Sequence, residues 1–388
     1  MNNRAAGIDL SDRSVELVSF RSRGRGVIDG IVRAELPPSI VSRGEIQDIP
    51  ELLKHVQPLF SSLFPNSSGK VQLGMALPET QVFSKIFRMP NGLEKKQYLQ
   101  ALEIAASEEF PFDSVSDMSY GSVCIEETEN GKFYLFSVTS LQLAEGYEQF
   151  MRELGAEPSF LEPESVALAR ATVPEQKDAV DILLADIGAR TTMLVVLGRH
   201  SQPIFSAAVP VGGDVLSTAI EEQLKISLAD AEQLKRKSGF DLTVDDGRVM
   251  MIIQQPFNEI AKEIKSTIDY YKKRTGRNVR KIMLAGGTSL LPVIIDYVSS
   301  RFPGIEVVTA DPLAGINISS SAPLPDNLKE EAVLYSTAIG LAQRAAGSRD
   351  RPGPDLLPRK TRSSRKKRSP LRYIRSIFKK VPSSYASK

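Results

Sequence analysis

The 388-residue sequence predicts an α/β protein built from two related halves. Strand-like and helix-like segments alternate along the chain, as in proteins whose sheets are covered by helices. Residues 186–192 form an acidic, glycine-containing turn between two apolar runs, which predicts a strand, a tight turn and a second strand. Residues 7–15 are a weaker copy of this turn, with Asp9 lying 177 positions before Asp186. Each half also begins with three successive strand-like runs.

The first half, residues 1–178, contains two blocks of elements. Its three opening strands end at Pro37 and Pro38, and Glu129-Asn130-Gly131 predicts a tight hairpin. The expected strands are 5–10, 14–21, 26–36, 71–77, 82–89, 120–125 and 132–138, and the expected helices are 49–57, 94–109 and 142–154. The block over about 80–155 predicts a compact α/β subdomain inserted in this half.

The second half, residues 179–347, repeats the three-strand opening. The expected strands are 181–187, 192–198, 203–210, 282–284 and 305–309, and the expected helices are 214–225, 228–237, 248–274, 292–302 and 329–346. With 41% apolar and 25% charged residues, the composition is that of an ordinary globular protein. One cysteine and two histidines exclude an intrachain disulfide and a histidine-rich metal site.

The basic tail, residues 348–388, has a different composition. From Arg349 onward there are 14 Lys or Arg residues against two acids, which leaves the preceding body with a net charge of about −10. Such a segment cannot bury a core, and we expect it to be disordered alone. Residues 359–381 fit an amphipathic helix drawn to an anionic membrane surface, and a solvated run of charge is equally compatible. No nucleic acid is expected as a partner, because interleaved aromatic residues and a binding fold are missing.

Three glycine-containing turns in the second half are the candidate ligand-binding residues. They lie at Gly188, at Gly212-Gly213 and at Gly286-Gly287. A single glycine pair is a weak signal, but this ordered set could surround one nucleotide, with phosphates at helix N-termini and carboxylates holding a hydrated Mg²⁺.

This set resembles the actin-like ATPase superfamily, which includes sugar kinases, heat-shock chaperones, FtsA and PilM. Asp9 matches its first phosphate hairpin and residues 186–192 match the second. Residues 162–169 look like its connecting helix, and residues 282–291 look like its adenosine motif. The resemblance implies an actin-like, ribonuclease H-like duplicated fold with a small inserted α/β subdomain.

The resemblance also implies a nucleotide site for ATP or ADP with Mg²⁺. Asp9 and Asp186 would hold the metal through water, and Glu162 and Asp186 would act if hydrolysis occurs, with Glu162 orienting the attacking water. Lys262 and Glu263 are assigned beside the adenine by their order in the chain alone. The implied nucleotide contacts are Asp9, Ser11, Ser14, Asp186, Gly188, Arg190, Thr191, Thr192, Gly212, Gly213, Lys262, Glu263, Gly286, Gly287, Thr288 and Ser289.

Within the superfamily, residues 5–346 most resemble PilM, the actin-like component of type IV pilus machines. The matching segments are 35–41, 44–46, 77–83, 87–90, 103–112 (especially 110–112) and 338–342. This resemblance implies a cytoplasmic adaptor at the inner membrane. It would bind nucleotide, contact other pilus machine components and capture the N-terminal peptide of a PilN-like membrane protein. The capture groove would lie between about 5–40 and 80–155.

The first hairpin departs from the family pattern. Ser11 replaces its glycine, Asp12 adds a charge, and Glu16 stands where a lysine is common. A side chain at Ser11 restricts the approach of phosphate, and added carboxylates repel it, although Arg13 or Arg190 could offset part of the charge. We therefore expect weakened nucleotide binding and at most weak ATPase activity. An actin-like fold with an empty site, an active actin-fold ATPase or kinase, and an FtsA-like membrane tether that polymerises are the alternatives.

Overall fold

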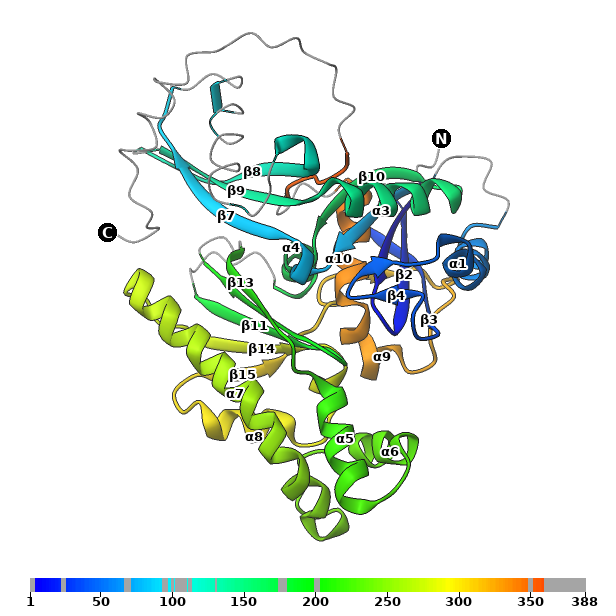
Figure 1. Ribbon diagram of the computed structural model, residues 1–388, viewed down its shortest axis with the longest axis vertical. Coiled ribbons are helices and arrows are strands. Elements are labelled where there is room, and N and C mark those ends of the chain that lie inside the picture. Colours follow the sequence, from blue (N-terminus) through cyan, green and yellow to red (C-terminus); the bar gives the residue numbers. More distant parts are fainter. Residues whose placement is uncertain are drawn as a thin grey trace.

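The computed structural model shows two sheets packed through a central pair of helices, with a smaller sheet at one side (Figure 1). The residues that the structure describes are 4–21, 26–65, 71–92, 97–98, 101, 110, 114–129, 131–173, 180–198, 203–347 and 352–358.

The first sheet holds six strands in the order β10-β6-β1-β2-β3-β16. β1 pairs antiparallel with β2, so that Asp9 lies opposite Glu16, and β1 pairs parallel with β6. The strands are β1 (Arg4–Leu10), β2 (Ser14–Arg21), β3 (Val27–Glu35), β6 (Gln72–Leu77), β10 (Glu157–Pro163) and β16 (Asn317–Ile318). A small ribbon of β4 (Val41–Ser42) and β5 (Glu45–Ile46) follows β3.

The second sheet repeats this arrangement in the order β13-β12-β11-β14-β15. Its strands are β11 (Ile182–Ile187), β12 (Thr192–Leu197), β13 (Pro203–Val209), β14 (Lys281–Ala285) and β15 (Glu306–Thr309). In both sheets an antiparallel three-strand meander is followed by two parallel strands on its other side. The predicted duplication is therefore confirmed, and Asp9 and Asp186 occupy equivalent positions one residue before the ends of β1 and β11.

The inserted sheet consists of β7 (Phe83–Met89), β9 (Gly131–Ser140) and β8 (Met118–Thr128), all antiparallel. Tyr98 and Ala101 pack on this sheet, and most of the helix expected at 94–109 lies outside the described residues. Helix α3 (Leu141–Glu153) was expected within the insertion. Its buried face, which includes Tyr147 and Phe150, instead joins the core of the first sheet, so the insertion itself ends near Ser140.

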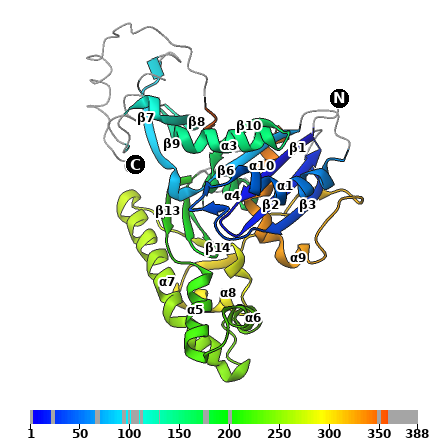
Figure 2. The same ribbon diagram turned by 45° about the vertical axis from the view of Figure 1, so that its right-hand side comes forward.

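Helices cover the outer faces of both sheets, while α4 (Glu164–Thr172) and α10 (Ser336–Ala345) lie between them. Helix α1 (Ile49–Leu63) covers the first sheet beside α3 and continues through Pro58, where the sequence predicted its end. Phe60 is buried in the same apolar core, and this packing extends the helix. The remaining helices are α5 (Gly213–Leu224), α6 (Leu228–Ser238), α7 (Arg248–Thr275), α8 (Ile294–Arg301) and α9 (Leu328–Glu331), shown from a second side in Figure 2.

Glycines allow α10 to approach its neighbours closely. A Cβ at Gly7 would lie 2.3 Å from the carbonyl oxygen of Ala338, and one at Gly340 would lie 2.0 Å from that of Ala167. Helix α10 therefore packs backbone to backbone against β1 and α4 and fixes the end of β1 that carries Asp9.

Residues 352–358, orange-red in Figure 1, differ from the disordered tail expected from residue 348. Leu356 is fully buried in the core of the first sheet. Among the described helices, none is long and apolar enough to cross a membrane.

Candidate functional site

The acids of the two equivalent hairpins lie at the junction of the halves. Both Asp9 and Asp186 are half-buried. Burial, followed by the charges of Glu16 and Asp186, raises the pKa of Asp9 well above its usual value. Burial, followed by the charge of Glu16, raises the pKa of Asp186 to about 6. These two predicted metal residues therefore share one electrostatic environment.

Two further acids belong to this group, and the sequence did not single them out. Burial, followed by the charges of Asp9, Asp186 and Glu79, raises the pKa of Glu164 well above its usual value. Burial also raises the pKa of Glu79, whose Oε2 accepts the amide of Ser165 at 3.3 Å. Among the residues that the structure describes, none hydrogen-bonds to the buried Oε1 atom of Glu79. The resulting excess of negative charge suits a hydrated divalent cation.

Glu162, the predicted water-orienting residue, does not join this group. It is fully buried and accepts hydrogen bonds from Arg170 at 2.5 and 2.8 Å and from Arg344. Burial opposes ionisation, but these two guanidinium groups lower the pKa of Glu162 below its usual value. β10 ends at Pro163 and α4 begins at Glu164. The acid whose pKa is raised by the charges of Asp9 and Asp186 is therefore Glu164, at the start of the helix, and not Glu162 in the strand.

The three glycine turns come together near Asp186, and their role around a nucleotide stays a prediction. The amide of Gly213 donates to the carbonyl of Gly188 at 2.9 Å, which joins the second hairpin to the start of α5. A Cβ at Gly286, whose φ is 76°, would lie 2.2 Å from Oδ1 of Asp186. A Cβ at Gly213 would lie 2.7 Å from Oγ1 of Thr288. The backbone at these turns therefore lies close to the carboxylate.

Lys235 and Glu232 of α6 lie beside these turns and were missed by the sequence. The Lys235 ammonium donates to the carbonyl of Gly213 at 2.9 Å and pairs with Glu232 at 2.6 Å. Burial alone would raise the pKa of Glu232. Hydrogen bonds from Lys235 and Ser217 outweigh this effect and lower the pKa to about 2. The buried residues of α6 are Ala231, Lys235 and Ser238, and a lysine at helical spacing from two small residues is the signal that could have identified it.

The position of Lys262 and Glu263 beside the adenine stays a prediction. Both are exposed on α7, and Lys262 pairs with Glu259 at 2.6 Å on the same helix. The neighbouring Ile260 and Ile264 form the buried face of α7 and turn the charged positions outward.

The first hairpin is closed by the side chain of Ser11. Its Oγ accepts the amides of Arg13 at 3.3 Å and Ser14 at 3.0 Å, and it also lies 3.1 Å from the hydroxyl of Ser14. Amides that a glycine would leave available for an anion are thus already bonded. Weakened phosphate binding stays a prediction, which these bonded amides support.

Equivalent arginines cross between the two hairpin regions. Arg13 of the first half pairs with Asp214 of α5 at 2.6 Å, and Arg190 of the second half pairs with Asp12 at 2.5 Å. Asp12 also accepts the amides of Arg43 and Gly44. The extra acid of the first hairpin is therefore neutralised by Arg190, one of the two arginines that the sequence offered for this purpose.

The remaining predicted residues fall into two groups. Thr191 is exposed in the second hairpin, and Gly212 and Gly287 flank the turns already described. Thr192 is fully buried and donates to the carbonyl of Val211 at 2.7 Å, and Ser289 donates to that of Gly286 at 2.7 Å. Their hydroxyl groups thus hold the turns in place.

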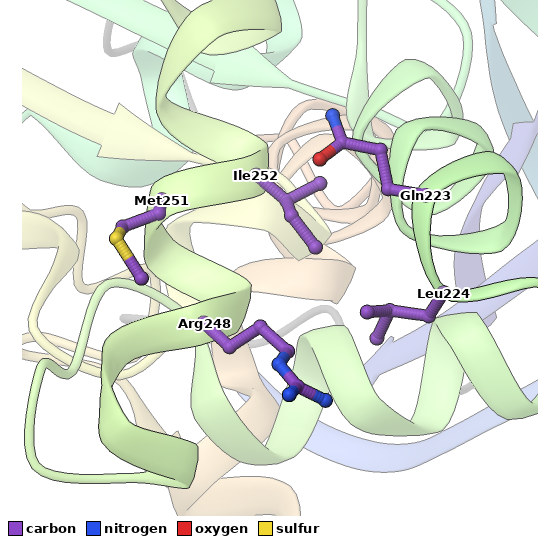
Figure 3. A pocket seen from close by; sticks show the side chains of 5 residues that line it. All are labelled: Gln223, Leu224, Arg248, Met251 and Ile252. Carbon is purple, nitrogen blue, oxygen red and sulfur yellow. The ribbon is translucent and has the colours of Figure 1, made fainter.

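An open depression lies between α5 and α7, away from these residues. Figure 3 shows Gln223 and Leu224 of α5 facing Arg248 and Ile252 of α7. None of the predicted site residues lines it. Over the described ranges, no three His, Cys, Asp or Glu side chains form a ready metal site.

Comparison with known proteins gives one family and several relatives. The family model described as type IV pilus assembly protein PilM matches residues 7–346. Cell division protein FtsA of Buchnera aphidicola subsp. Schizaphis graminum is 25% identical over 203 residues, which are 45% of this chain and 46% of that protein. Ethanolamine utilization protein EutJ of Escherichia coli K12 is 26% identical over 151 residues, 37% of this chain and 49% of that protein. The chain thus spans about half the length of these curated relatives.

Solved structures confirm the actin-like fold. A structure of a PilM-PilN type IV pilus biogenesis complex aligns with a TM-score of 0.73 at 18% identity, over 89% of this chain and 99% of that one. EutJ of Carboxydothermus hydrogenoformans aligns with a TM-score of 0.53 at 18% identity, over 88% and 90% of the two chains. MreB5 of Spiroplasma citri bound to ADP aligns with a TM-score of 0.50 at 13% identity, over 87% and 94%.

Proposed function

The chain belongs to the family of type IV pilus assembly proteins named PilM, and on that basis we propose that it is a nucleotide-responsive adaptor. It captures the cytoplasmic N-terminal peptide of a PilN-like inner-membrane protein and works at the cytoplasmic face of that membrane. The observation that carries the proposal is an extended peptide, residues 352–358 of the chain itself, held between β8 and β10. β8 belongs to the insertion, while β10 belongs to the first sheet but lies outside residues 5–40, where the sequence placed that side of the groove. The similar solved structure is a complex of PilM with PilN, so that relative has a partner of the kind proposed.

Nucleotide binding is the second part of the proposal. The glycine turns and Lys235 would hold ATP or ADP, while Asp9 and Asp186 would hold Mg²⁺ through water. The metal would neutralise phosphate charge, and Glu164 rather than Glu162 would face the reacting end of the nucleotide. The bonded amides at Ser11 support weak binding and slow or absent hydrolysis. Contact of residues 359–381 with anionic lipid stays a prediction, because these residues lie outside the described part of the chain.

A titration tests this function. Synthetic peptides copying the cytoplasmic N-terminus of a PilN-like protein are titrated into the full chain by calorimetry, alongside an assay of phosphate release from Mg-ATP. The proposal predicts one peptide per chain and turnover that is slow or undetectable. Absence of peptide binding together with rapid turnover would instead favour an active ATPase or kinase. Nucleotide-dependent filaments without peptide binding would favour an FtsA-like role.

A further inference from the structure

Residues 352–358 are bound between the inserted sheet and the first sheet in the manner of a peptide ligand. The amide of Leu356 donates to the carbonyl of Leu161 in β10 at 2.7 Å, and the Ser119 hydroxyl of β8 donates to the carbonyl of Leu356 at 2.8 Å. The Asp355 carboxylate accepts the amides of Leu161 at 3.4 Å and Leu357 at 3.0 Å. The Leu356 side chain is fully buried. One leucine anchor and main-chain hydrogen bonds are the means by which extended peptides bind to sheet edges.

Two glycines make the close approach of this segment possible. A Cβ at Gly121 of β8 would lie 2.3 Å from the carbonyl oxygen of Asp355. A Cβ at Gly353 would lie 2.1 Å from Oε2 of Glu162. A side chain at either glycine would therefore collide with the backbone or with the buried carboxylate. The segment and its binding position thus fit each other closely.

The buried ion pair around Glu162 forms the base of this position. Arg344 of α10 binds Glu162 and donates to the carbonyl of Pro354 at 3.3 Å. Its guanidinium also stacks over the ring of Phe160, 4.0 Å from the centroid. The arginine thus offers a fixed donor to the main chain of whatever peptide occupies this position. We call Ser119, Gly121, Leu161, Glu162 and Arg344 the peptide seat.

We propose that residues 352–358 are an internal ligand of the peptide seat and compete there with the partner peptide. This inference rests on the proposed function and deepens it. The partner peptide is extended and carries an acceptor side chain immediately before a leucine, because those two groups make the contacts of Asp355 and Leu356. The chain therefore regulates its own capture of the partner, which binds only by displacing the internal segment.

The strength of this competition follows from the connection to α10. Only residues 348–351 separate Gly347 from Pro352. A short connection gives the attached segment an effective concentration of about 1 mM. We therefore expect the internal segment to weaken an added peptide of similar affinity by about ten-fold or more.

The test uses a fluorescent synthetic peptide with the sequence of residues 352–358 and measures its binding to full chains by anisotropy. In Leu356→Ala the internal segment loses its buried anchor, and the peptide should bind about ten-fold or more tightly than to the wild-type chain. Pro352→Ala, at an exposed position of the same segment, is the matched control and should behave as wild type. Thermal melting checks that both variants are folded. Equal binding to all three chains, or none to Leu356→Ala, overturns the proposal.

Hydrogen exchange at Leu356 separates this inference from the proposed function. Adding a PilN-like N-terminal peptide to the wild-type chain should release protection of the Leu356 amide, because the internal segment leaves the peptide seat. If that peptide binds while Leu356 stays protected, the internal-ligand proposal fails and the proposed function stands. If Leu356→Ala binds the 352–358 peptide but neither chain binds the PilN-like peptide, the internal ligand is supported and the proposed partner is wrong.

Discussion

Asp186 is held at a junction where its ionised form is unfavourable. Its neighbours Asp9, Glu16 and Glu164 are also acidic, and of these Glu16 is paired with Arg33 at 2.7 Å. A carboxylate kept in such surroundings lowers the stability of the protein unless a cation binds it. A cation bound beside Asp186 would therefore stabilise the ionised form of this carboxyl group.

The raised pKa of Asp186 predicts a stability change with a defined pH dependence. Below pH 3.8, the usual pKa, Asp186 is protonated in both states and contributes no penalty. Its penalty grows as pH rises from 3.8 to about 6, because the unfolded chain releases this proton first, and it is complete above about pH 6. Asp186→Asn should therefore raise the free energy of unfolding at pH 8 by about 1–3 kcal/mol, and by less at pH 4.5, in urea titrations.

The same variant should bind Mg-nucleotide at least about ten-fold more weakly, since it loses a metal-directed carboxylate. The exposed Asp326→Asn is the control and should change neither quantity. Destabilisation by Asp186→Asn at pH 8 would contradict this description of the junction.

Substitution of Ser11 should strengthen nucleotide binding, whereas Asp186→Asn should weaken it. Ser11→Gly frees the amides of Arg13 and Ser14 for a phosphate, and the affinity for Mg-ATP should rise about three- to ten-fold in calorimetric titrations. Ser11→Ala keeps the Cβ and should give a smaller gain, because the side chain still restricts the approach of phosphate. Unchanged affinity in both variants would show that this hairpin does not contact the nucleotide.

At the scale of elements, the two hairpins are joined by ion pairs that cross between the halves. The Arg13 and Arg190 side chains are 57% and 49% exposed, so each pair should contribute only about 0.2–1 kcal/mol to stability. Their effect should instead be on the local opening of the hairpins, because each pair joins segments about 180–200 residues apart in the chain.

The double variant Arg13→Ala, Arg190→Ala tests this role. We expect faster amide hydrogen exchange at residues 11–14 and 188–191, with a melting temperature within about 4 °C of wild type. Arg152→Ala removes a comparable exposed pair with Glu148 inside α3 and should leave exchange at both hairpins unchanged. Unaltered exchange in the double variant would mean that other contacts hold the halves together.

The crossing of α4 and α10 gives a paired prediction on stability. Gly340→Ala places a Cβ 2.0 Å from the carbonyl of Ala167, so the helices must separate, and the free energy of unfolding should fall by about 1–3 kcal/mol. Gly146→Ala in α3 meets nothing within 4 Å and should raise it by up to about 1 kcal/mol. Urea titrations that gave the same sign for both variants would contradict the close crossing.

At the scale of the whole molecule, the duplicated fold could be predicted because each half repeats its own strand pattern and acidic turn. The meeting of the glycine turns around Asp186 followed from that fold. The sequence could not predict that Glu164, rather than Glu162, lies near Asp9 and Asp186. This depends on the exact residue at which β10 ends and α4 begins. Lys235 was missed because its contact with the carbonyl of Gly213 depends on how α6 folds back against α5, which the residue pattern of α6 does not indicate.

Residues 352–358 were missed for a different physical reason. The average composition of 348–388 is dominated by its Lys and Arg residues, which predict a segment without a core. A seven-residue segment needs only one buried leucine and a few main-chain hydrogen bonds to dock on an existing sheet. A short ligand-like segment of this kind is visible only when its binding position is known.

Capture of a partner peptide between the inserted sheet and the first sheet is the central part of the proposed function. Hydrogen exchange of the full chain with and without a PilN-like N-terminal peptide tests it most directly. We predict that the peptide changes exchange most strongly at residues 118–128 and 157–163, the strands β8 and β10, and less at the hairpins 11–14 and 188–191. A peptide that binds and alters exchange only at the hairpins, or leaves β8 and β10 unaffected, would contradict this function.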